Sequence, residues 1–145
     1  MNRQRVIFEA PGRVRVETGP LPRPGAGEGL VATRLSAISA GTEMLAFQGR
    51  FPPYLPLDAS LPALGTAPFA YPQAYGYSCV GTVASAGPGV AAEWPGRRVF
   101  AFQPHQSHFV CRPAELLPLP PGLADDHAVF LPAMETAVNP ASAAT

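Results

Sequence analysis

The chain has 145 residues, of which 47% are hydrophobic, so it is long enough for one domain with a core and too apolar to be disordered throughout. Ten arginines balance ten acidic residues and lysine is absent, which leaves no basic surface for a nucleic-acid backbone. Nineteen prolines argue against a mainly helical protein, because proline removes a helix donor and clashes with the preceding turn.

Two further features bear on location. No apolar run approaches the roughly 20 residues of a membrane-spanning helix, and the N-terminus has no signal-peptide core behind it. The two cysteines, Cys79 and Cys111, are too few for a disulfide framework and are expected to be small core residues. We therefore expect a soluble, cytoplasmic protein that binds neither nucleic acid nor a membrane.

The first elements are predicted to be strands. Arg5–Glu9 and Arg13–Glu17 alternate around a Pro-Gly turn, which indicates a hairpin. A turn-rich connector follows, and Leu30–Ser39 alternates well enough to predict a longer strand.

A short helix and a long loop are predicted next. One or two helical turns over 42–48 are expected to begin at Thr42 as N-cap and to be closed by Gly49. The stretch Phe51–Pro72 holds six prolines and no sustained period, which predicts a loop over the mouth of a barrel.

The centre of the chain has the pattern of three strands, Ser78–Ser85, Arg98–Phe102 and His108–Cys111, each a short β-branched or aromatic run. The Gly-Pro-Gly at 87–89 and the Trp-Pro-Gly at 94–96 between them are typical of turns. Three strands in close succession predict a meander or part of a small barrel.

Two helices are predicted near the end of the chain. The first begins over Ala124–Phe130, with Asp125 and Asp126 in its first turn, where acids favour the helix dipole. The second is Met134–Asn139, which Pro140 is expected to stop.

Three stretches carry a pattern in a fixed order. They read SAISAGTE at 36–43, then GYSCVGTVASAGPGV at 76–90 followed by PGRRVFAF at 95–102, then FVC with PAELLPLP at 109–120. This order resembles S-G-[IV]-C-x-T-D, G-H-E-x-x-G-x-V-x-x-V-G-x-x-V with G-D-R-V, and Y-V-x-V-P with a later L-P. Together these motifs mark the N-terminal GroES-like, alcohol dehydrogenase-like domain of the medium-chain dehydrogenase/reductase superfamily.

The resemblance implies a fold and a domain division. The fold would be mainly β, a GroES-like partly open β-barrel with a few short helices. Residues 1–130 would form the substrate-side domain, and residues 131–145 would start the crossover toward a nucleotide-binding domain. No G-x-G-x-x-G stretch opening a helix occurs in the chain, so the Rossmann domain that would hold a dinucleotide is expected to be missing.

The resemblance also places the family's catalytic zinc ligands. The Cys position falls on Ser39, within one residue, because Ala40-Gly41 stands where the family has a single residue. The His position falls on Tyr77 and the Glu position on Ser78. None of these side chains is a good zinc ligand, so no zinc is expected.

Thr42, Glu43 and Tyr77 are the candidate catalytic residues. Thr42 and Glu43 match the family's Thr-Asp pair, in which the hydroxyl relays a proton from the substrate and the acid sits behind the metal. Capping of a short helix explains the same pair without catalysis. Tyr77 could donate a hydrogen bond to substrate, or it could be a barrel tyrosine whose hydroxyl lies at the rim.

Thr136 and the group of two histidines and a cysteine each have two interpretations. Thr136 matches a family threonine that touches the nicotinamide end of the cofactor, and alternatively it is an exposed helix residue. His105 and His108 with Cys111 could supply metal ligands, but a turn of surface histidines is the favoured interpretation, because His108 and Cys111 would face opposite sides of a strand.

The resemblance implies the substrate-side domain of an NAD(P)-dependent oxidoreductase that acts on a small alcohol or carbonyl, truncated and inactive alone. NAD or NADP would then be held by a separate Rossmann domain. The alternative is a stand-alone GroES-like binding or interaction module without catalysis. A non-functional fragment with an exposed apolar face is a third possibility.

Overall fold

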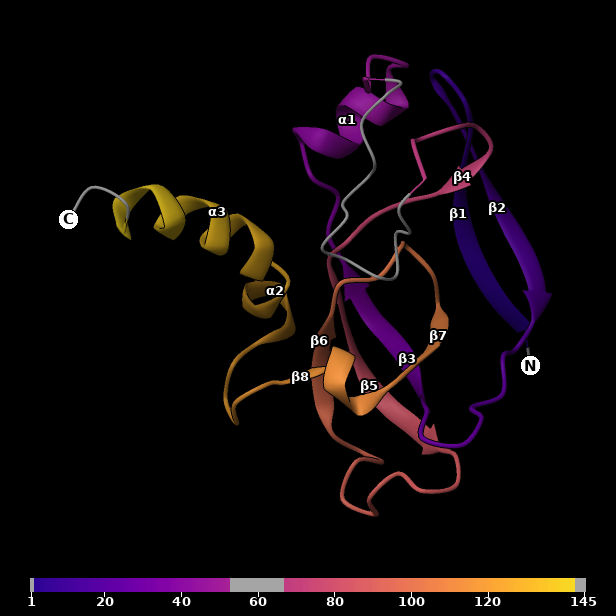
Figure 1. The fold of residues 1–145 in the computed structure, drawn as a ribbon, viewed down its shortest axis with the longest axis vertical. Coiled ribbons are helices and arrows are strands. Elements are labelled where there is room, and N and C mark those ends of the chain that lie inside the picture. Colours follow the sequence, from indigo (N-terminus) through magenta and orange to yellow (C-terminus); the bar gives the residue numbers. More distant parts are fainter. Residues whose placement is uncertain (1, 53–66, 143–145) are drawn as a thin grey trace.

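The computed structural model describes residues 2–52 and 67–142 (Figure 1). Eight strands and three α-helices are described in these ranges, with one 3-10 turn. In chain order they are β1 (Asn2–Ala10), β2 (Arg13–Pro20), β3 (Gly29–Ser36), α1 (Thr42–Phe47), β4 (Gln73–Ala74), β5 (Cys79–Ala86), β6 (Arg98–Ala101), β7 (His108–Cys111), η2 (Pro113–Glu115), β8 (Leu117–Pro118), α2 (Asp125–Ala128) and α3 (Leu131–Ser142).

The strands form two antiparallel sheets. The first has the order β2-β1-β4 and the second the order β7-β3-β5-β6-β8. The predicted opening hairpin is confirmed, with Arg5 opposite Glu17 and a turn in which Gly12 has φ 71°, a value that glycine adopts without strain. The protein is mainly β, as predicted.

The two sheets are joined where β1 passes the loop before β7. An antiparallel bridge pairs Arg5 with Gln106, and the Val6 N–H donates to the carbonyl of His105 at 2.9 Å. One strand therefore bonds to a partner in its own sheet and to a segment leading into the other. This connection makes the two sheets a partly open barrel.

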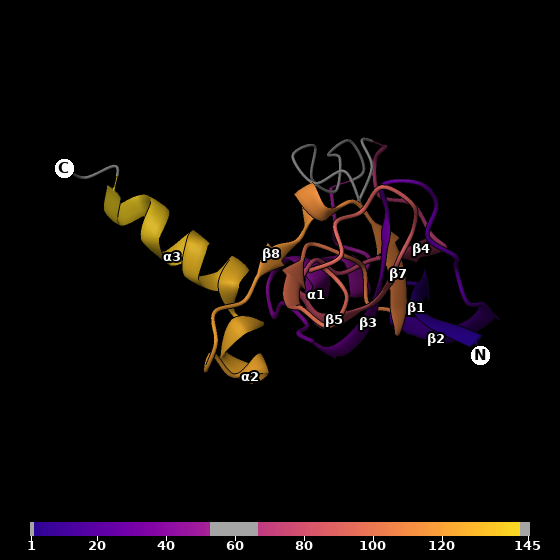
Figure 2. The same ribbon diagram turned by 90° about the horizontal axis from the view of Figure 1, so that it is seen from below.

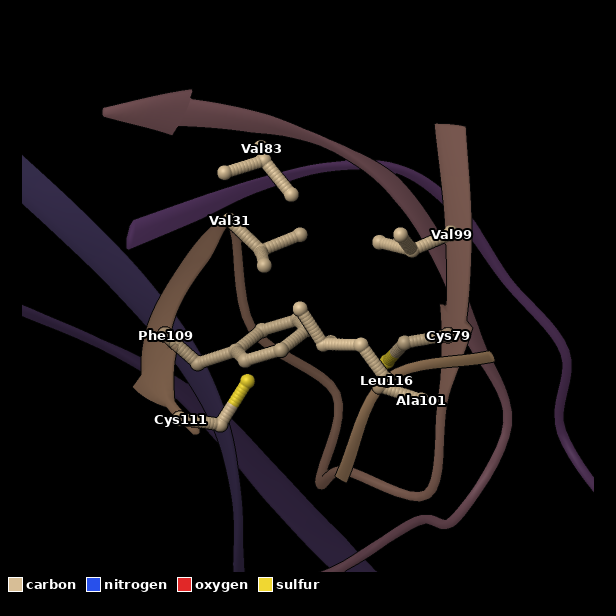
Figure 3. Close-up of a cluster of buried hydrophobic side chains, with 8 residues drawn as sticks. All are labelled: Val31, Cys79, Val83, Val99, Ala101, Phe109, Cys111 and Leu116. Carbon is tan, nitrogen blue, oxygen red and sulfur yellow. The ribbon is translucent and has the colours of Figure 1, made fainter. Parts of the chain in front are cut away.

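The barrel core follows from strand periodicity, since alternate residues of a strand face opposite sides. Residues 79 and 83 of β5, 99 and 101 of β6, and 109 and 111 of β7 all point inward. Figure 3 shows these side chains meeting between the strands. The cluster consists of Val31, Cys79, Val83, Val99, Ala101, Phe109, Cys111 and Leu116, all at most 5% exposed.

The outward-facing residues of the same strands meet α2. Val80 and Phe100 are fully buried against Ala128 and Val129. The predicted helix start is confirmed, with Ala124 as N-cap and two aspartates in the first turn. Asp125 accepts hydrogen bonds from the guanidinium groups of Arg34 (2.6 Å) and Arg98 (2.5 Å), which fastens α2 to the second sheet.

The three central strands are not a meander. β5 pairs with β6, but β7 pairs with β3 at the other edge of the sheet. The chain leaves β6, forms the loop that bonds to β1, and only then returns. Long-range pairing therefore decides the neighbour of β7, and of the two predicted arrangements the small barrel holds.

The last helix is longer than predicted. α3 begins at Leu131 and continues to Ser142, so the prediction that Pro140 stops it is wrong. Proline removes one backbone donor, and the helix extends only two residues beyond it. Figures 1 and 2 show α3 pointing away from the barrel.

The predicted loop Phe51–Pro72 falls mostly on residues 53–66, which lie outside the described residues. Its described ends carry aromatic side chains: Phe51 and Phe69 pack against Tyr75, and Tyr71 packs edge-on against Phe69. None of the helices described in the two ranges is long and apolar enough to cross a membrane.

Candidate functional site

A cavity of about 510 Å³, here called the cleft, lies where three segments of the chain meet. The first is the turn from β3 into α1, the second is the segment just before β5, and the third is the junction of α2 and α3. The lining residues are Ala37, Ile38, Ser39, Ala40, Thr42, Tyr77, Ser78, Val129, Phe130, Pro132, Ala133 and Thr136.

The first wall of the cleft is the turn that leads into α1. β3 ends at Ser36, and Gly41 is the N-cap of the helix, with its carbonyl accepting the Leu45 N–H at 3.1 Å. The prediction that Thr42 is the N-cap is therefore wrong. Thr42 is the first helical residue, and its exposed side chain lines the cleft.

The predicted end of this helix is confirmed. Gly49 has φ 72°, the left-handed conformation in which glycines commonly close helices. Its N–H donates to the carbonyl of Ala46 at 3.2 Å, so the helix has less than two turns. A helix this short cannot hold itself in place, and its orientation must come from tertiary contacts.

The second wall is Tyr77 and Ser78. The half-buried Tyr77 ring packs beside Tyr75, with 6.3 Å between ring centroids, and faces the cleft. The buried Ser78 hydroxyl donates to the carbonyl of Val129 at 2.5 Å. This bond ties the segment just before β5 to the end of α2 and so fixes the second wall against the third.

The third wall is the first half of α3. Thr136 lines the cleft, and its hydroxyl donates to the carbonyl of Pro132 at 3.0 Å, within the helix. The neighbouring apolar side chains are open to solvent, with Phe130 57% and Met134 59% exposed. The cleft is thus an open groove with an apolar rim.

The structure brings together three of the four predicted site residues. Thr42, Tyr77 and Thr136 come from different segments of the chain and line the same cavity. Glu43 does not line it. Its side chain is 1% exposed and lies on the other side of α1, where a second cavity of about 360 Å³ is found.

Glu43 forms a buried pair with a residue that the sequence did not single out as its partner. His105 Nε2 lies 2.6 Å from Glu43 Oε2, and His105 Nδ1 lies 2.9 Å from the Ser36 hydroxyl. The other carboxylate oxygen of Glu43 accepts the Ser39 N–H at 3.0 Å. The prediction of a turn of surface histidines is wrong for His105, which is 5% exposed.

The position of His105 follows from its backbone. Its carbonyl accepts from β1 and its N–H donates to the Tyr75 carbonyl at 3.1 Å, and these backbone bonds hold His105 between two segments of the barrel. No local pattern signals this, because Glu43 and His105 are 62 residues apart. Burying an acid or a histidine without a hydrogen-bond partner costs free energy, and the bond between these two side chains reduces that cost.

The two cysteines are buried and free, as predicted. Burial and the nearby Glu43 carboxylate raise the pKa of Cys79 to about 12. Burial and the Glu115 and Glu28 carboxylates raise the pKa of Cys111 to about 12. Both thiols therefore stay protonated near neutral pH and act as small core residues.

Metal ligands are not gathered in the parts of the chain that the structure describes. Within residues 2–52 and 67–142, no group of three His, Cys, Asp or Glu side chains is placed to hold a metal ion. At the cleft, the positions that the family motif gives to zinc ligands carry two serines and a tyrosine. These hydroxyls suit hydrogen bonding to a neutral oxygen better than coordination of zinc.

The chemistry that the cleft can offer is therefore hydrogen bonding inside an apolar groove. Thr42 and Tyr77 present hydroxyls, and Ala37, Ile38 and Ala133 supply apolar contacts. A small alcohol or carbonyl compound has the complementary features, one polar oxygen on an apolar body.

Comparison with known proteins gives one curated relative and many similar structures, whereas no family model matches the chain. The relative is the 2-desacetyl-2-hydroxyethyl bacteriochlorophyllide A dehydrogenase of Cereibacter sphaeroides, which is 35% identical over 95 residues. That match covers 66% of this chain and 26% of the relative, so the chain spans about a quarter of the curated protein that it matches.

Two solved structures show how far the fold extends. The human synaptic vesicle membrane protein VAT-1 homolog-like protein superposes with a TM-score of 0.68 at 18% identity, covering 91% of this chain and 40% of that one. An alcohol dehydrogenase from Escherichia coli CFT073, solved with NADH, gives a TM-score of 0.66 at 18% identity, covering 89% and 42%. The chain has the fold of the N-terminal GroES-like domain of the medium-chain dehydrogenase/reductase superfamily.

Proposed function

We propose that this chain is the substrate-side domain of an NAD(P)-dependent oxidoreductase and that its cleft binds a small alcohol or carbonyl compound. The observation that carries the proposal is the meeting of Thr42, Tyr77 and Thr136, from three different segments of the chain, in one cavity of about 510 Å³. The similarity to a dehydrogenase from Cereibacter sphaeroides and to a structure that contains NADH supports the same reaction class.

The proposed division of labour is simple. A nicotinamide cofactor, held by a separate Rossmann domain, would supply or accept the hydride. The Thr42 and Tyr77 hydroxyls would hydrogen-bond the substrate oxygen and so polarise a carbonyl or orient an alcohol. The apolar lining would hold the rest of the substrate.

Thr136 has a different proposed role. It lies on α3, the helix that leads away from the barrel (Figure 1), and it lines the cleft, so a cofactor-binding domain that follows this helix would meet it first. Its hydroxyl is engaged with the Pro132 carbonyl, which leaves its methyl group to contact the nicotinamide. Residues 131–145 would accordingly begin the crossover, with residues 1–130 as the substrate-side domain.

The test measures carbonyl-dependent oxidation of NADH and NADPH by the chain joined on one polypeptide to a dinucleotide-binding domain. We expect activity that Thr42→Ala and Tyr77→Phe each lower about 100-fold, the loss typical of a positioned proton donor. The matched control is Thr18→Ala, an exposed threonine on β2, which should leave the rate unchanged. Full activity in both cleft variants would refute the proposal.

A further inference from the structure

The feature behind this inference is the buried pair of Glu43 and His105, which lies outside the cleft and whose side chains do not line it. A carboxylate that is 1% exposed and an imidazole that is 5% exposed lose most of their hydration. Burying such a pair is often no more stabilising than packing apolar residues of the same size. Stability alone is therefore a weak reason for placing these groups here.

The pair joins three segments at one point. The His105 ring contacts the Glu43 carboxylate through Nε2 and the Ser36 hydroxyl through Nδ1. Its face lies against the backbone of Gly76, so closely that a Cβ there would come within 2.6 Å of the ring carbon Cδ2. Gly76 also has φ 121°, which side-chain-bearing residues rarely adopt.

Each of the three residues that the His105 ring contacts is next in the sequence to a residue that lines the cleft. Glu43 adjoins Thr42, Gly76 adjoins Tyr77, and Ser36 adjoins Ala37. The second oxygen of Glu43 also holds the Ser39 N–H, which is part of the cleft wall. The His105 ring therefore contacts both of the segments that carry the cleft-lining hydroxyls, one through Glu43 next to Thr42 and the other through Gly76 next to Tyr77.

We propose that Glu43 and His105 are positioning residues, which set the relative placement of the Thr42 and Tyr77 side chains in the cleft. The proposal rests on the function proposed above for those two hydroxyls. α1 has six residues and is too short to be rigid alone, so the Glu43 contacts orient its first turn. The same ring packs against Gly76, which directly precedes Tyr77, and so restricts where the backbone of Tyr77 can lie.

The test compares NMR spectra of proteins labelled at threonine methyl groups and at tyrosine and phenylalanine rings. In folded Glu43→Ala, we expect the Thr42 methyl and Tyr77 ring signals to shift or split, while the Phe100 ring, in the outer layer under α2, keeps its signals. The matched control is Glu28→Ala, which removes a carboxylate that also accepts a backbone N–H, from Gly25 at 2.9 Å, but lies away from the cleft. Its Thr42 and Tyr77 signals should match those of the wild type.

A conservative variant separates positioning from bulk stability. In Glu43→Gln the carboxamide oxygen can still accept the Ser39 N–H, and its NH2 can donate to His105 Nε2 while Nδ1–H donates to Ser36. We expect this variant to restore both signals. Ser36→Ala, which removes one support of the ring, is the second probe where Glu43→Ala does not fold, and it should shift the Tyr77 signals.

Unchanged Thr42 and Tyr77 signals in folded Glu43→Ala would overturn the positioning role, as would unchanged Tyr77 signals in Ser36→Ala where the first variant does not fold. Because the readout uses no substrate or cofactor, this outcome is distinct from failure of the proposed function. Normal signals together with activity loss in Thr42→Ala would leave the proposed function standing and remove only the role of the pair.

Discussion

Gly81 lies inside β5, which pairs with the neighbouring strand β3. A Cβ built on it would lie 2.5 Å from the carbonyl oxygen of Ala32 and 2.7 Å from Cγ1 of Val31, both on the neighbouring strand β3. Ordinary contacts of carbon with oxygen or carbon are about 3.3 Å or longer. The substitution Gly81→Ala therefore requires two central strands to separate by close to an ångström.

The expected cost follows from this overlap. Overpacking a rigid core costs about 1–3 kcal/mol, and a backbone carbonyl cannot rotate away as a side chain can, so we expect the upper end, about 3 kcal/mol. Replacing glycine also lowers the conformational entropy of the unfolded chain, but this stabilises the protein by only about 0.4–1 kcal/mol. For a domain of this size, a net loss of about 2–3 kcal/mol lowers Tm by roughly 4–12 °C.

The assay is urea unfolding followed by tryptophan fluorescence, with thermal unfolding alongside. The control is Gly19→Ala on β2, where a Cβ would meet no atom within 4 Å and φ is not positive. This control should be neutral or slightly stabilising. Equal stability of Gly81→Ala and the wild type would refute the close approach of β3 and β5 and with it the packing of the barrel.

Three further predictions concern charge, thiols and metal. Arg34 and Arg98 hold the pKa of Asp125 below its usual range, so the stability that this carboxylate contributes is present above its unfolded pKa and lost as the pH falls through its folded pKa. The unfolding free energies of Asp125→Asn and the wild type should thus differ at pH 7 and converge in strong acid, and a constant difference would contradict the assignment. Because burial raises the pKa of both Cys79 and Cys111 to about 12, neither should react with a thiol reagent at pH 8 until urea unfolds the chain. Elemental analysis of protein purified without chelators should find no equimolar zinc, and stoichiometric zinc would show that other side chains supply the ligands.

The strands could be predicted because the residues that indicate each strand lie within or directly beside it in the sequence. The runs that became β5, β6 and β7 have β-branched and aromatic residues bounded by glycine and proline, and the structure places the strands within about a residue of the predicted bounds. The order of those strands is not local information. β7 pairs with β3 through contacts more than 70 residues apart in the sequence, which no periodicity encodes.

The site was predictable in part for the same reason. The motif at 36–43 and the residues at 76–78 indicated Thr42 and Tyr77, and the structure places both in the cleft. The pairing of Glu43 with His105 could not be predicted, since the burial of His105 depends on backbone bonds to β1 and to Tyr75. The sequence pattern favoured a turn of surface histidines over a metal site, whereas tertiary contacts bury His105 beside Glu43.

The most direct measurement is an NMR titration of the chain with benzyl alcohol as the probe, following backbone amides and side-chain methyl groups. We predict saturable shifts at Thr42, Tyr77 and Thr136, the residues that three segments of the chain bring to the cleft, and unchanged signals at Val14 and Phe47 in the second cavity. Shifts confined to the second cavity, or no saturable shift at the cleft, would contradict the assignment of the cleft as the substrate site.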